Sequence, residues 1–145
     1  MQALAAGTAV AGDLDWLLAT DPIAASDERR SRFLRLGLAD VRCEIACLGD
    51  PRAGFAVWHR QFFSRPFLAL LAVDCGYRRR GIGTALTRHV IAKIGAGDDF
   101  FTSTNASNCA AQRLFDRLGF VRSGTIDHID PGDPEWIYVL PRVNG

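Results

Sequence analysis

The chain has 145 residues, 48% of them hydrophobic, and a formal net charge of +1. These values predict one folded domain over residues 1–145 and exclude a disordered chain, and the near-neutral charge argues against nucleic-acid or membrane-surface binding. No stretch has the ~18 apolar residues of a transmembrane helix and no basic signal-peptide segment is present, so we expect a cytoplasmic protein without a membrane partner.

The first 62 residues predict two helices followed by a β-hairpin. Each predicted helix begins at a residue that can cap its first turn, Asp13 and Ser26. The expected elements are helices over 13–21 and 26–38 and strands over 41–48 and 54–62. Residues 1–11 are rich in alanine and glycine, so they leave open whether a further strand comes first.

A strand, a glycine-rich basic loop and a helix follow one another in the middle of the chain. The unbroken apolar run Phe67–Val73 has the length and composition of a strand that is buried on both faces. Apolar residues then recur at helical spacing from Ile82 to Ile94. Between the two lie Gly76, three successive arginines and two further glycines. The loop therefore leads directly into a helix N-terminus.

This loop predicts a phosphate-binding site. The first backbone N–H groups of a helix lack intrahelical partners and carry partial positive charge, and Gly81 and Gly83 allow a ligand to approach them closely. A nucleoside triphosphate is disfavoured because Ile82 stands where a Walker A loop requires lysine. A nicotinamide dinucleotide is disfavoured because Leu86 stands where its fingerprint requires glycine or alanine.

The spacing Arg78-x-x-Gly81-x-Gly83 resembles the acetyl-CoA-binding motif Q/R-x-x-G-x-G/A of the GNAT N-acetyltransferase superfamily. A second block is similar to the family pattern N-x-x-A-x-x-L-Y/F-x-x-x-G-F and consists of Asn108, Ala111, Leu114, Phe115, Gly119 and Phe120. The two blocks have the family's order and separation and cover about the C-terminal half of the chain. The resemblance implies an α/β fold with a mixed, mostly antiparallel central sheet flanked by about four helices.

The remaining expected elements agree with this fold class. They are a strand over 99–104, a helix from Ser107 as its cap to Gly119 as its stop, and strands over 120–129 and 136–140. The chain's four cysteines (Cys43, Cys47, Cys75 and Cys109) show neither a CxxC pair nor zinc-ligand spacing. We expect reduced thiols and no metal site.

The resemblance implies an enzyme that transfers an acetyl group from acetyl-CoA, its co-substrate, directly to a primary amine of a small molecule or peptide. It also implies a monomer or homodimer. The backbone N–H of Val73 would polarise the thioester carbonyl. The residues that the resemblance assigns to the acetyl-CoA site are Ala72, Val73, Arg78, Arg79, Arg80, Gly81, Ile82, Gly83, Thr84, Asn105, Asn108 and Phe115.

The usual side chains for proton transfer are absent. Phe115 stands where many members of the family have tyrosine, and Ser103 stands where some relatives have a glutamate base. Glu44 and Tyr138 are the catalytic candidates that we name instead, and weaker possibilities are His59, His128 and Glu135. Because a general acid or base is typically worth ~10²–10⁴ in rate, an enzyme remains our main interpretation. The alternative is a non-catalytic acyl-CoA-binding sensor or scaffold.

The segment 127–135 is acidic and has two interpretations that we weigh equally. Its carboxylates, on Asp127, Asp130, Asp133 and Glu135, lie where the family's last two strands border the acceptor site, so they would attract a cationic amine. Alternatively, aspartate and proline at 130–134 simply build a tight connection between two strands.

Overall fold

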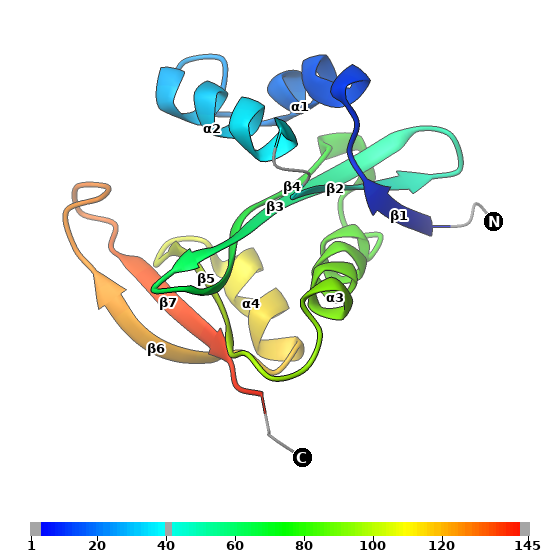
Figure 1. The fold of residues 1–145 in the computed structure, drawn as a ribbon. Coiled ribbons are helices and arrows are strands. Elements are labelled where there is room, and N and C mark those ends of the chain that lie inside the picture. Colours follow the sequence, from blue (N-terminus) through cyan, green and yellow to red (C-terminus); the bar gives the residue numbers. More distant parts are fainter. Residues whose placement is uncertain (1–3, 40–41, 143–145) are drawn as a thin grey trace. The chain divides into compact units, whose positions relative to one another are not determined.

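The computed structural model describes residues 4–39 and 42–142. The chain, whose helices and strands are labelled in Figure 1, divides into two compact units. Unit 1 contains residues 1–58 and 70–92, and unit 2 contains residues 59–69 and 93–145. One domain over residues 1–145 therefore stays a prediction, and the two units are described separately below.

The described residues contain seven strands and four α-helices. The strands are β1 (Leu4–Thr8), β2 (Cys43–Leu48), β3 (Arg52–Phe62), β4 (Arg65–Val73), β5 (Phe100–Asn105), β6 (Val121–Ile126) and β7 (Glu135–Leu140). The helices are α1 (Leu14–Thr20), α2 (Glu28–Ala39), α3 (Ile82–Ile94) and α4 (Cys109–Arg117), with short 3₁₀ turns η1 (Ala11–Asp13) and η2 (Cys75–Tyr77). The strands have the hydrogen-bonded order β1-β2-β3-β4-β5-β7-β6, in which β4 and β5 are parallel. The predicted mixed, mostly antiparallel sheet with four helices is confirmed.

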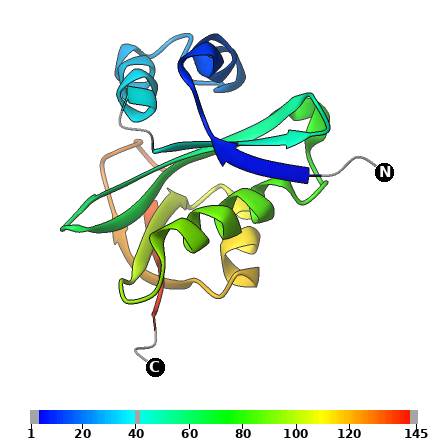
Figure 2. The ribbon, with the colours of Figure 1, turned by 45° about the vertical axis from the view of Figure 1, so that its right-hand side comes forward.

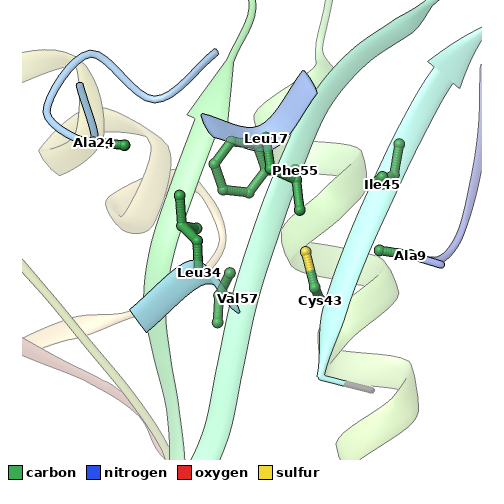
Figure 3. Packing of buried hydrophobic residues seen from close by; sticks show 8 residues of the cluster. All are labelled: Ala9, Leu17, Ala24, Leu34, Cys43, Ile45, Phe55 and Val57. Carbon is green, nitrogen blue, oxygen red and sulfur yellow. The ribbon is translucent and has the colours of Figure 1, made fainter. Parts of the chain in front are cut away.

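In unit 1, helices cover both faces of the antiparallel strands β1 and β2 and the first part of β3. Helices α1 and α2 lie on one face and α3 on the other (Figure 2). Successive residues of a strand point to opposite faces, so Phe55 faces α1 and α2 while Gly54 faces α3. The core on the α1–α2 side consists of Ala9, Leu17, Ala24, Leu34, Cys43, Ile45, Phe55 and Val57 (Figure 3).

Helix α3 lies very close to strand β3 at Gly54. A Cβ atom at this position would lie 2.8 Å from the carbonyl oxygen of Ala72 and 3.0 Å from Cγ2 of Ile82. It would also lie 3.3 Å from Cδ1 of Leu86. Glycine is therefore what allows the first turns of α3 to pack directly on the strand.

In unit 2, helix α4 covers one face of strands β5 and β7. The ring of Phe115 lies 5.4 Å from that of Phe120 and 5.5 Å from that of Tyr138, measured between centroids. The other face carries aromatic rings from three strands, because Phe62 contacts both Phe67 and Phe101. Helix α4 therefore covers one face of these strands, and aromatic side chains of β3, β4 and β5 pack together on the other face.

The turn between β3 and β4 has an unusual backbone. Phe63 and Ser64 both have positive φ, at 51° and 64°, although neither is glycine. Two left-handed residues match the twist of a tight β-hairpin. Strand β4 begins at Arg65, two residues before the predicted start, because Pro66 is tolerated at the first residues of a strand.

The structure answers one open question of the secondary structure and differs from the predicted caps of α2 and α4. A first strand, which the sequence leaves open, is present as β1. Helix α2 is capped by Asp27, whose Oδ1 accepts from the Arg29 N–H at 2.8 Å, rather than by Ser26. Helix α4 is capped by Asn108 rather than by Ser107, one residue later than expected. Val41, the first residue of the predicted second strand, lies outside the described residues.

Candidate functional site

The loop between β4 and α3 in unit 1 is built by Asp74. Its backbone N–H donates to the Ala53 carbonyl at 2.8 Å and its carbonyl accepts from the Tyr77 N–H at 2.8 Å. Its side-chain Oδ1 accepts from the Gly76 N–H at 3.0 Å. These bonds turn the chain away from β4 immediately after Val73 and lead it toward the N-terminus of α3 (Figure 1).

Two residues of the loop adopt left-handed backbone conformations. Arg79 has φ 64° and Gly81 has φ 76°. The Gly81 carbonyl accepts from the Ala85 N–H at 3.0 Å, so Gly81 is the residue from which α3 begins. The N–H groups of the following turn have no partner within the helix. Apart from Gly81 and its two chain neighbours, no heavy atom of residues 4–39 and 42–142 lies within 4 Å of where a Gly81 Cβ would be, so the backbone is open to an approaching ligand.

The three successive arginines add positive charge beside this helix start. Arg78, Arg79 and Arg80 are exposed, and no ion pair within residues 4–39 and 42–142 involves them. The guanidinium carbon of Arg80 lies 5.6 Å from the ring centroid of Tyr77, within the range of a cation–π contact. Open N–H groups together with exposed guanidinium groups fit a polyphosphate ligand.

Helix α3 is also joined to β2 by a partly buried polar contact. Glu44 Oε2 lies 3.2 Å from Nε2 of His89, and the Glu44 side chain is 0% exposed. Glu44 points to the α3 side of the sheet, one residue along from Cys43 in the opposite core. The full burial of the Glu44 side chain favours a structural role over a catalytic one.

Cys43 is buried in the core on the other face. Its burial, reinforced by the Glu44 charge, raises the pKa of its thiol to about 12, so the thiol is uncharged near neutral pH.

We predict that His89→Ala destabilises the protein by about 1–3 kcal/mol, because the buried Glu44 carboxylate loses a hydrogen-bond partner. Urea unfolding measures the loss. The matched control is Arg88→Ala, an exposed neighbour on the same helix, which should change the free energy of unfolding by less than about 0.5 kcal/mol. Equal losses in the two variants would show that the Glu44–His89 contact contributes nothing to stability.

In unit 2, the second sequence block forms helix α4 and its cap. Asn108 Oδ1 accepts from the Ala111 N–H at 3.2 Å, which gives a physical reason for the N-x-x-A spacing. Phe115 is 3% exposed and packs in the core of this unit. Burial, with a smaller contribution from the Asp116 carboxylate, raises the pKa of Tyr138 above its usual value. Its burial against Phe115 favours a packing role for Tyr138.

The end of β5 is tied to the connection between β6 and β7. Asn105 Nδ2 donates to Oδ2 of Asp130 at 2.8 Å and to the Asp133 carbonyl at 3.2 Å. Ser107 donates to Asp133 twice, through its N–H at 3.0 Å and its hydroxyl at 2.6 Å. These contacts support the turn-building interpretation of Asp130 and Asp133 and give Asn105 a structural partner.

One polar contact on the face opposite α4 was not predicted from the sequence. The Ser103 hydroxyl donates to Oε1 of Glu135 at 2.7 Å. The two residues are 32 positions apart and meet only through the register of β5 and β7. Glu135 is one of the weaker proton-transfer candidates by sequence, and no local sequence pattern pairs it with Ser103.

Two kinds of feature are absent from the part of the chain that the structure describes. Within residues 4–39 and 42–142, no three His, Cys, Asp or Glu side chains are grouped as metal ligands would be. None of the helices in these same ranges combines the length and the apolar character needed to cross a membrane.

A family model described as the acetyltransferase (GNAT) family matches residues 14–120. The chain belongs to this family. The matched range includes the loop at 78–83 and the whole of helix α4, so both sequence blocks lie within it.

Curated relatives of this GNAT chain include an N-alpha-acetyltransferase 30 from Xenopus laevis, 38% identical over 86 residues. That alignment covers 55% of this chain and 32% of the relative. The chain thus matches about a third of the length of this longer protein.

Solved structures agree with the fold. A GNAT-family acetyltransferase from Bacillus cereus has a TM-score of 0.85 and 28% identity, covering 98% of this chain and 99% of that one. The ribosomal-protein-S18-alanine N-acetyltransferase from Escherichia coli has a TM-score of 0.82 and covers 99% of this chain and 96% of its own. At 22% identity, the second likeness shows the fold alone.

The predicted acetyl-CoA residues of this GNAT chain fall in both units. Unit 1 holds Ala72, Val73 and the stretch 78–84, and unit 2 holds Asn105, Asn108 and Phe115. In unit 1 the side chain of Ile82 packs toward Gly54, so this position can offer a ligand only its backbone. The assignment of these residues to acetyl-CoA stays a prediction and is developed next.

Proposed function

We propose that this chain is an N-acetyltransferase that moves the acetyl group of acetyl-CoA directly onto a primary amine. The observation that carries the proposal is the start of α3, where Gly81 at φ 76° opens the backbone beside three exposed arginines. In a member of the GNAT family, this geometry supports binding of the pyrophosphate of acetyl-CoA.

Within unit 1, we assign the pyrophosphate to the N–H groups that follow Gly81, at Ile82, Gly83 and Thr84. The guanidinium groups of Arg78, Arg79 and Arg80 would neutralise phosphate charge. The backbone N–H of Val73, at the end of β4, would polarise the thioester carbonyl, with Ala72 beside it. Backbone donors serve in these roles whatever side chain the position carries.

Within unit 2, we assign to acetyl-CoA the residues Asn105, Asn108 and Phe115. Their contacts are already structural, since Asn105 ties the β6–β7 connection, Asn108 caps α4 and Phe115 fills the core. We therefore propose that they act by holding the backbone around β5 and α4 in shape rather than by side-chain chemistry.

For the acceptor, we propose the α-amine of a peptide or protein. The support is that curated relatives of part of this chain are named N-alpha-acetyltransferases. An α-amine has a pKa of about 7.7–8.0 against about 10.4 for lysine, so a far larger fraction is neutral near pH 7. We further propose that the protein acts in the cytoplasm as a monomer or homodimer.

The proposal is tested by isothermal titration of the purified chain with acetyl-CoA, ATP and NADH in parallel. We expect micromolar binding of acetyl-CoA and no binding of NADH, since the loop departs from the dinucleotide fingerprint. Weak binding of ATP through its phosphates alone is compatible with the proposal. Tighter binding of ATP than of acetyl-CoA would contradict it.

A further inference from the structure

The Ser103–Glu135 contact lies on the face of β5 and β7 that α4 does not cover. Glu135 pairs with Asn105 across the ladder, and Ser103 pairs with Ile137. Tyr138, which packs on Phe115 beneath α4, is one residue further along β7 than Ile137 and so points to the opposite face. Glu135 and Ser103 are both half-buried, so the carboxylate is held on the sheet rather than extended into water.

The Glu135 carboxylate takes part in no ion pair among residues 4–39 and 42–142. Arg122, on the neighbouring strand β6, lies over the ring of Trp136 at 3.7 Å from its centroid and donates to the Thr125 hydroxyl. Trp136 is adjacent to Glu135 in β7 and points to the opposite face, the one that carries Tyr138. Arg122 therefore makes these contacts on the face opposite the Glu135 carboxylate.

Strand β6, which lies beside Glu135, is exposed along its whole length. Gly124 of β6 pairs with Ile137, and a Cβ atom at Gly124 would meet no heavy atom within 4 Å. Ile126, which pairs with Glu135 itself, is exposed. A half-buried carboxylate beside an exposed strand can be reached by a ligand and can accept charge-assisted hydrogen bonds from an ammonium group.

We propose that Glu135 binds the ammonium group of the acceptor and removes its proton, and that Ser103 is the positioning residue that orients the carboxylate. This inference rests on the proposed function. Ser103 occupies Oε1, so Oε2 is the atom that receives the ammonium proton.

The proton and bond changes balance with acetyl-CoA as the donor. The ammonium group gives one proton to Glu135 and becomes a neutral amine. Its nitrogen forms a bond to the thioester carbon, and the bond from that carbon to sulfur breaks. The departing thiolate takes the surplus proton of the new amide nitrogen and leaves as the thiol of CoA. Glu135 then releases its proton to water.

The test is Glu135→Gln, which keeps the shape and an oxygen that accepts from Ser103 but removes the charge and the basic group. The unsubstituted protein is first assayed with a set of heptapeptides that differ in their first residue. Acetyl transfer by each variant is then measured on the peptide that the unsubstituted protein acetylates fastest. We expect kcat/KM for the peptide to fall about 100-fold or more, with the Kd for acetyl-CoA unchanged. Glu28→Gln, the same change at an exposed position of α2, should leave kcat/KM within about twofold.

Ser103 is tested separately because it acts through Glu135. Ser103→Ala should lower kcat/KM for the peptide several-fold, and Ser103→Thr, which restores a hydroxyl, should recover most of the activity. Unchanged kcat/KM in Glu135→Gln would overturn this inference while leaving the proposed function standing. No acetylation of any peptide by the unsubstituted protein would overturn both.

Discussion

Gly81→Asp is expected to weaken acetyl-CoA binding by about 100-fold or more. The added carboxylate would stand at the start of α3, where we place the pyrophosphate, and two negative groups at one helix N-terminus repel each other. Aspartate is among the residues that tolerate the left-handed region, and no neighbouring atom obstructs a side chain at this position. The fold should therefore survive, at a cost of about 1–2 kcal/mol for the positive φ. Isothermal titration with acetyl-CoA measures the change.

Gly81→Asn is the matched control for this variant. Asparagine has almost the same shape as aspartate and the same tolerance of positive φ, but it carries no charge. We expect it to lose about the same stability as Gly81→Asp and to bind acetyl-CoA at least tenfold more tightly than Gly81→Asp does. If the aspartate and asparagine variants bound acetyl-CoA equally well, no phosphate group would lie near residue 81.

Gly54→Ala is expected to destabilise the protein by about 2–3 kcal/mol, a large effect for adding one methyl group. The new Cβ would lie 2.8 Å from the Ala72 carbonyl oxygen, which belongs to the backbone of β4 and cannot rotate away. It would also press on Ile82 and Leu86, in the first turns of α3, so the helix must shift outward. We expect a lower urea midpoint and weaker acetyl-CoA binding in the same variant.

Gly7→Ala makes the same chemical change where there is room for it. Gly7 lies in β1 and a Cβ there would meet no heavy atom within 4 Å. Alanine costs less conformational entropy than glycine in a strand, so this variant should be as stable as the original or more stable by about 0.5 kcal/mol. A loss of more than 1 kcal/mol in Gly7→Ala would show that a methyl group on a strand glycine destabilises the protein even without a close neighbour. The close contacts with α3 would then not explain the effect of Gly54→Ala.

The parts of the fold that depend on short sequence patterns could be predicted. The strand, loop and helix at 67–94 were predicted because an apolar run, a glycine-rich loop and a helical repeat follow one another within 28 residues. The bounds of α3, Ile82–Ile94, agree with the apolar repeat that begins and ends at these residues. The cap of α4 lies one residue later than predicted because Ser107 and Asn108 are both good capping residues, and the Ser107 hydroxyl donates to Asp133, in the distant β6–β7 connection, rather than capping the helix.

The parts of the candidate site that depend on distant residues could not be predicted. Glu44 meets His89 across 45 residues, and only the packing of α3 on β2 brings them together. Ser103 meets Glu135 because β5 and β7 pair in one register, and a shift of one residue would place the carboxylate on the α4 side. The same register places Tyr138, a catalytic candidate by sequence, against Phe115 on the α4 side of the sheet.

The most direct measurement is acetyl transfer itself. The purified chain is incubated with acetyl-CoA and the heptapeptide set, and free thiol release and peptide mass are followed together. We predict thiol release that depends on the peptide, in equal amount to the N-terminally acetylated product, and its loss in Gly81→Asp. Binding of acetyl-CoA without transfer to any peptide or small amine would contradict the account and would favour a protein that only senses acyl-CoA.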